Sequence, residues 1–205
     1  MCIRDRTTLH LDGDFSDLRP LSGLRALTTL SLQSRQVRDL TPLAGLPMLE
    51  TLSVRNPAAT GFVGLSRLPR LTSLSLAHSF ALTGLSGLSG LPSLVSLNLT
   101  NLSKLTDIAA VARLPSLQTL DLSACRSLTD LRPLSGLSQL RVLKMGDHMV
   151  QSSSDSLLSD LGPLSGLSAL ETLELSDRSQ VTDLSPLAAL SRLTRLWVQR
   201  CPGVT

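Results

Sequence analysis

The chain has 205 residues, a formal net charge of +3 and a hydrophobic content of 42%, with one Trp, three Phe and no Tyr. Aliphatic side chains, mostly leucine, must therefore supply its core. Basic residues are spread singly and no aromatic stacking platform accompanies them, which argues against nucleic-acid binding. Apolar runs stay shorter than the roughly 18 residues of a membrane helix, so we expect no membrane span.

Residues 1–6 differ from everything that follows. They read MCIRDR, which resembles the translation of an adapter used in sequencing libraries, and Arg6 stands where the repeat described next requires leucine. We expect a non-native scar here, with a divergent native terminus as the alternative. Any signal peptide would then have been lost upstream, so the compartment stays open between the cell surface and the cytoplasm.

One leucine pattern recurs from residue 7 to residue 205. Each unit reads LxxLxL and then LxDLxPLxxL, as in residues 117–140, and the units begin near residues 6, 27, 49, 71, 94, 117, 140, 170 and 193. A period of 22 or 23 residues is typical of a solenoid, whose units bury their apolar faces only against each other. We expect a single domain over residues 7–205, truncated at both ends and hence prone to end-to-end self-association.

The first half of each unit predicts a short strand. Leu97 and Leu99 alternate with Asn98, so the two leucines face the core and Asn98 faces the other way. The pattern predicts nine short parallel strands, one in each repeat, which together form the concave face of an α/β solenoid.

The second half predicts tight turns on the convex face. Aliphatic residues recur there at every third position, which suits 3-10 and short helical turns better than a long α-helix. A proline at one equivalent position fits a first helical turn: Pro20, Pro42, Pro133, Pro163 and Pro186. An aspartate three residues earlier is placed to accept backbone N–H groups, a structural role: Asp17, Asp39, Asp130, Asp160 and Asp183.

The phrase LxxLxLxxRxVxDLxPLxxL of residues 27–46 resembles the short leucine-rich repeat of the internalins and of a nuclear regulatory subunit of protein phosphatase-1. The resemblance covers essentially the whole chain after Arg6. It implies a right-handed leucine-rich-repeat horseshoe and leaves the function open among adhesion, scaffolding and substrate recognition. Asparagine is usual after the strand in that family, whereas other residues stand at that position here: Asp14, Arg35, Pro57, Ser79, Leu102, Cys125, His148, Arg178 and Cys201.

Candidates for chemistry are few. Cys125 and Cys201 lie three repeats apart, roughly 14 Å at strand spacing, which is too far for a disulfide, so we expect buried thiols. The three histidines fall in different repeats, and no hydrolase, zinc or phosphate-loop motif occurs. We therefore predict no catalytic residues, no metal and no cofactor.

Two local features stay open. The repeat that begins at Leu140 is about seven residues too long, with the excess in residues 146–156 around His148, which is either a binding loop at the rim or a neutral loop. Asn98 and Asn101 begin glycosylation sequons, which matter only in a secreted eukaryotic protein.

Strand alternation identifies the side chains on the concave face. Early repeats present small polar groups: Thr29, Ser31, Thr51, Ser53, Ser73, Ser75 and Ser96. Later repeats present larger ones, which with His148 form the candidate partner-binding set: Asp121, Lys144, Glu174, Arg195 and Trp197. A solvated face with weak ion pairs between Lys144 and its two acidic neighbours is the alternative.

These patterns predict a non-catalytic module that binds a protein partner through its concave face. Two alternatives remain open: the substrate-recognition arm of a larger enzyme or receptor, and a structural protein of a surface array.

Overall fold

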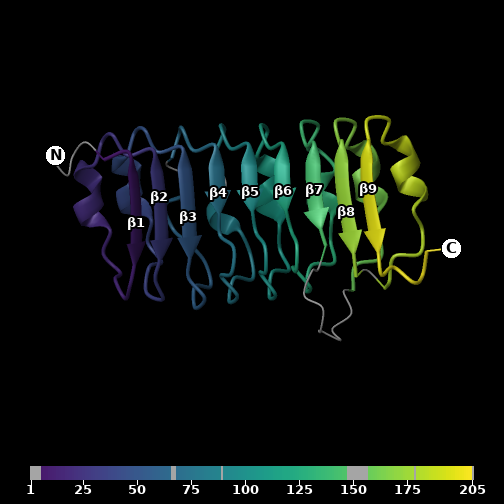
Figure 1. The fold of residues 1–205 in the computed structure, drawn as a ribbon, viewed down its shortest axis with the longest axis horizontal. Coiled ribbons are helices and arrows are strands. Elements are labelled where there is room, and N and C mark those ends of the chain that lie inside the picture. The colour runs from purple at the N-terminus through teal and green to yellow at the C-terminus, as the bar shows by residue number, and fades with distance from the viewer. Residues whose placement is uncertain (1–5, 66–67, 89, 147–156, 178, 205) are drawn as a thin grey trace.

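The computed structural model describes residues 6–65, 68–88, 90–146, 157–177 and 179–204. Within these residues nine strands form one parallel sheet, in the order in which they occur along the chain (Figure 1). The strands are β1 (Thr8–Asp12), β2 (Thr29–Gln33), β3 (Thr51–Arg55), β4 (Ser73–Ser75), β5 (Ser96–Asn98), β6 (Thr119–Asp121), β7 (Val142–Met145), β8 (Thr172–Ser176) and β9 (Arg195–Gln199). The fold is the predicted leucine-rich-repeat solenoid.

Short 3-10 helices lie behind most of the strands in Figure 1, and the outermost ones are seen beyond β1 and β9. They are η2 (Arg19–Gly23), η3 (Thr41–Gly45), η5 (Ser86–Leu88), η6 (Ala109–Arg113), η7 (Arg132–Leu134), η8 (Gly162–Gly166) and η9 (Ser185–Ala189). In the five helices that contain a proline of the repeat, that proline occupies the first or second helical position, where the missing N–H costs nothing. The predicted 3-10 turns are therefore confirmed.

The leucines of the strands form continuous ladders in the core. Leu30 and Leu32 of β2 are at most 1% exposed. Thr29 and Ser31, which alternate with them along the strand, are half-buried on the opposite face. Leu30 lies opposite Leu52 of the next strand, and the same register continues from strand to strand. Neighbouring repeats thus bury each other's apolar side chains, and the alternation expected from the sequence is confirmed.

The recurring spacing of aspartate and proline has a structural cause. In each such turn an aspartate Oδ1 accepts the backbone N–H two residues further on, at 2.7–2.9 Å, which fixes the entry to the 3-10 helix. The aspartates are Asp17, Asp39, Asp107, Asp130, Asp160 and Asp183. Asp107 was not expected, because Ala110 replaces proline in its repeat. Its turn shows that the aspartate can fix the entry to the 3-10 helix without the proline.

Four of these turn aspartates favour their ionised form. The side chain of Arg19 holds the pKa of Asp17 below its usual value, and Arg132 does the same for Asp130. Hydrogen bonds from Thr41 lower the pKa of Asp39. The backbone N–H of Ser185 lowers the pKa of Asp183.

These lowered pKa values predict a modest sensitivity to acid. Because the folded chain binds these protons more weakly than the unfolded chain, the contribution to stability is present above the ordinary aspartate value of 3.8 and is lost as the pH falls through the lower folded values. Solvent screens such exposed groups, so the effect is small. We expect the urea midpoint of unfolding to fall when the pH is lowered from above 3.8 to below it, and to fall further for the wild type than for a variant with all four aspartates changed to asparagine. Equal falls in the two proteins would contradict the lowered pKa values.

The difference between repeats of 22 and 23 residues arises just after the strand. In the repeats that begin at residues 71, 94, 117, 170 and 193, one residue after the strand adopts a left-handed backbone conformation, with φ of 52–63°. The residue after it is the one that we assign to the family's asparagine position. These left-handed residues are His78, Asn101, Ala124, Asp177 and Arg200.

The repeats that begin at Leu27 and Leu49 have no left-handed residue just after the strand. This corrects the residues that the sequence pattern places at the family's asparagine position. There Ser34 and Asn56, which are 4% and 0% exposed, occupy the buried position that we had assigned to Arg35 and Pro57. The hydroxyl of Ser34 donates to the carbonyl of Phe15 in the preceding repeat at 2.6 Å. Counting from the strand misplaced the site by one residue because the turn is one residue shorter.

Asn56 shows what this buried position does. Its amide donates to the Val37 carbonyl of the preceding repeat, and its Oδ1 accepts the N–H of Ala58 at 3.0 Å. Its own N–H donates to the Ser79 hydroxyl of the following repeat at 3.2 Å. One side chain thus satisfies backbone groups in the turns of consecutive repeats, as buried polar groups require.

The two cysteines of the later repeats differ in burial. Cys125 is buried, and its Sγ lies 3.1 Å from the Leu99 carbonyl of the preceding repeat. Cys201 is only half-buried, so the expectation of a second buried thiol was wrong, because β9 has a neighbouring strand on one side only. In the described part of the chain no helix has the length and hydropathy needed to cross a membrane.

Candidate functional site

A hollow of about 390 Å³ opens on the face of the sheet that points away from the 3-10 helices, which we call the open face. Five residues from three adjacent strands line it: Lys144, Glu174, Ser176, Trp197 and Gln199. Lys144, Glu174 and Ser176 alternate with core residues of β7 and β8. Trp197 and Gln199 continue the same register on β9, where Leu196 on the opposite face is itself 44% exposed. Three of the predicted partner-binding residues therefore meet at one place.

The register of the sheet explains this meeting. Lys144 on β7 lies opposite Glu174 on β8, and Glu174 lies opposite Trp197 on β9. Parallel neighbours are only about 4.8 Å apart, so side chains in one such row lie in contact range. One row thus brings together a cation, a carboxylate and an indole.

The ion pair in this row is loose. The Nζ of Lys144 lies 3.7 Å from Oε1 of Glu174, which exceeds hydrogen-bond distance, and the two side chains are 40% and 18% exposed. The carboxylate therefore keeps acceptor capacity while much of its surface is screened from water.

Trp197 provides the large apolar surface of the hollow. Trp197 is 45% exposed, and its neighbour Leu196 is 44% exposed, because β9 has a neighbouring strand on one side only. Arg195 precedes Trp197 by two residues on the same face and is also exposed, but it does not line the hollow. An exposed tryptophan next to arginine is the composition typical of an interface hot spot.

The other predicted site residues are placed differently. Asp121 on β6 lies opposite Lys144, but its Oδ1 accepts the Ser123 N–H at 2.9 Å and the expected ion pair between Asp121 and Lys144 does not form. It does not line the hollow. His148 lies outside the described residues, so its expected role at the rim stays a prediction.

Two residues of the hollow were not expected. Ser176 and Gln199 lie two positions beyond Glu174 and Trp197 on the same strands and face. Continuing the alternation by one more step would have found both. They add a hydroxyl and an amide, each able to donate and to accept hydrogen bonds.

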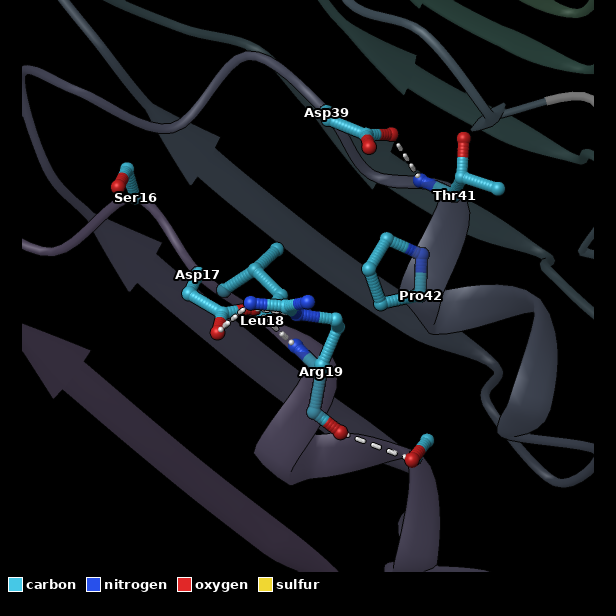
Figure 2. Close-up of a pocket in the computed structure, with 8 residues that line it drawn as sticks. Ser16, Asp17, Leu18, Arg19, Asp39, Thr41 and Pro42 are labelled. Carbon is cyan, nitrogen blue, oxygen red and sulfur yellow. Dashed lines mark hydrogen bonds and ion pairs between the residues drawn. The ribbon is translucent and has the colours of Figure 1, made fainter.

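A second hollow of about 520 Å³ lies among the turns of the first repeats (Figure 2). Its charged groups are engaged within the turns themselves. Asp17 accepts the N–H of Arg19 and pairs with its guanidinium at 2.9 Å, and Asp39 accepts the N–H of Thr41. We assign these residues to the structure of the turns.

A third hollow of about 560 Å³ lies at the ends of β1–β3 and is lined by Asp12, Asp14, Arg35 and Arg55 among others. It has no exposed aromatic side chain. The small hydroxyl residues expected on the early strands indeed occupy the open face beside it, half-buried. Among the strand residues that the structure describes, the open face presents an exposed aromatic side chain at β9 alone.

Parallel strands stacked in chain order, leucine ladders and 3-10 turns define this chain as a leucine-rich-repeat protein of the short repeat class, and the fold is that of repeat domains that mediate protein interactions. No family model and no curated protein matches the sequence.

Solved structures show the likeness. The chain is 29% identical to internalin C2 (inlC2) of Listeria monocytogenes, with a TM-score of 0.68, over 86% of this chain and 75% of that one. It is 25% identical to the internalin inlF of the same species, with a TM-score of 0.64, over 89% of this chain and 57% of that one. It thus spans little more than half of the second internalin.

The leucine-rich-repeat domain of the type III effector XCV3220 (XopL) is also similar. Its identity is 22% and its TM-score 0.62, over 94% of this chain and 76% of that one. At this identity the likeness shows the fold alone.

Proposed function

We propose that this chain is a non-catalytic module that binds a protein partner through the C-terminal half of its open face. The observation that carries the proposal is the hollow in which the exposed indole of Trp197 meets the loosely paired Glu174 and Lys144. Interfaces concentrate their binding energy in a few such anchors surrounded by polar groups.

The extended shape of the sheet supports a protein partner over a small molecule. The row of side chains that passes through the hollow continues from β9 to Asp121 on β6. A partner that follows this row would contact four strands, or about 14 Å of sheet.

Photo-crosslinking tests which face binds. A photoreactive amino acid would replace Gln199, at the hollow, or Ser135, which is exposed on the turn after η7, in separate variants. After irradiation in extracts of cells that carry the gene, we expect a specific adduct from position 199 and none from position 135. Adducts from position 135 alone would place the working surface on the turns and overturn the proposal.

A further inference from the structure

The hollow of the open face combines the two groups that together favour a cation. The indole of Trp197 offers the electron-rich face that attracts cations, and Glu174 lies directly opposite it on the neighbouring strand. The hydroxyl of Ser176 and the amide oxygen of Gln199 add hydrogen-bond acceptors at the same place.

We propose that this hollow receives an arginine side chain of the protein partner. The inference rests on the proposed function and specifies the chemistry of the partner. A guanidinium can stack on the indole with its plane while its N–H groups bind a carboxylate in pairs. The 3.7 Å separation from Lys144 leaves Glu174 available for such hydrogen bonds.

An acidic partner group fits the same hollow poorly. Of the five lining residues, Lys144 alone carries a positive charge, and Glu174 lies beside it. Because Lys144 and Glu174 offer one charge of each sign, the indole decides between the two ligands: its negative face repels a carboxylate and attracts a cation. Arg195 lies outside the lining.

Trp197 is also the reporter for the test. The chain has one Trp and no Tyr, so selective excitation of the indole reads this site alone. We would titrate the protein with acetyl-arginine amide, with the neutral acetyl-citrulline amide and with acetyl-glutamate amide. The expected result is a saturable change in emission with the arginine compound at millimolar concentration and none with the other two. Saturation by the glutamate compound, or equal responses to arginine and citrulline, would overturn the proposal.

Two substitutions move this affinity in opposite directions. Glu174→Gln removes the charge that holds the guanidinium and should weaken binding of acetyl-arginine amide about tenfold. Lys144→Met keeps most of the aliphatic chain, removes the competing cation and should strengthen binding a few-fold. The matched control is Glu171→Gln, at an exposed carboxylate paired with Arg141 outside the hollow, and its affinity should equal that of the wild type.

The two proposals can fail separately. If Lys144→Met weakens binding, or Glu174→Gln leaves it unchanged, the arginine pocket is wrong. If a partner is nevertheless crosslinked at position 199, the proposal that the open face binds the partner still stands. Adducts confined to position 135 would remove both proposals together.

Discussion

Replacing Leu122 with aspartate should unfold the middle of the solenoid. Leu122 is fully buried in the leucine ladder between repeats, and its N–H donates to the Lys144 carbonyl of the next strand at 2.8 Å. A carboxylate at this position would lie in an apolar core without a charged partner. We expect a loss of at least about 3 kcal/mol, which in a repeat protein also uncouples the two neighbouring units. Thermal denaturation followed by circular dichroism measures it.

The adjacent position supplies the control. Asp121 points to the open face, and a serine there can still accept the Ser123 N–H, so Asp121→Ser should cost less than about 1 kcal/mol. Leu122→Met conserves volume and should cost less than about 1.5 kcal/mol. If Leu122→Asp and Asp121→Ser melt at the same temperature, the assignment of faces along β6 is wrong.

The sequence predicted the solenoid because its apolar pattern allows one arrangement. Leucines such as Leu97 and Leu99 alternate with polar residues, and a strand that slipped by one residue would turn both leucines to solvent. In the five turns that contain both, the aspartate and the proline predicted where the 3-10 helix begins, because each acts on its own turn.

The details that could not be predicted depend on turns of different length. Ser34 and Asn56 take the buried position because their turns lack the extra left-handed residue of the longer repeats. Leucine spacing records that a repeat is one residue shorter but does not show where the residue is missing. The local burial and hydrogen bonds of the turn decide it.

The candidate site was partly predictable in the same way. Alternation placed Lys144, Glu174 and Trp197 on one face, because side-chain direction follows the strand. It did not reveal that Lys144 pairs with Glu174 and leaves Asp121 to its own turn. Such choices between equivalent neighbours depend on side-chain conformations that a repeat pattern does not contain.

Replacing Trp197 with alanine should remove most of the affinity for the partner. The indole is the largest exposed apolar group at the hollow, and truncating an interface tryptophan typically costs about 2 kcal/mol or more, which corresponds to roughly thirtyfold in affinity. Because Trp197 is 45% exposed, the fold should tolerate the change, and circular dichroism of each variant checks that it remains folded. Glu174→Gln should weaken the same complex, by less.

Calorimetric titration of the captured partner onto Trp197→Ala and Ser135→Glu compares the two faces of the solenoid directly. Ser135 is exposed on the turn after η7, where its hydroxyl donates to the Arg132 carbonyl, far from the open face of the sheet. The proposed function predicts a roughly thirtyfold loss for Trp197→Ala and wild-type affinity for Ser135→Glu. Wild-type affinity for Trp197→Ala together with a loss for Ser135→Glu would contradict binding through the open face.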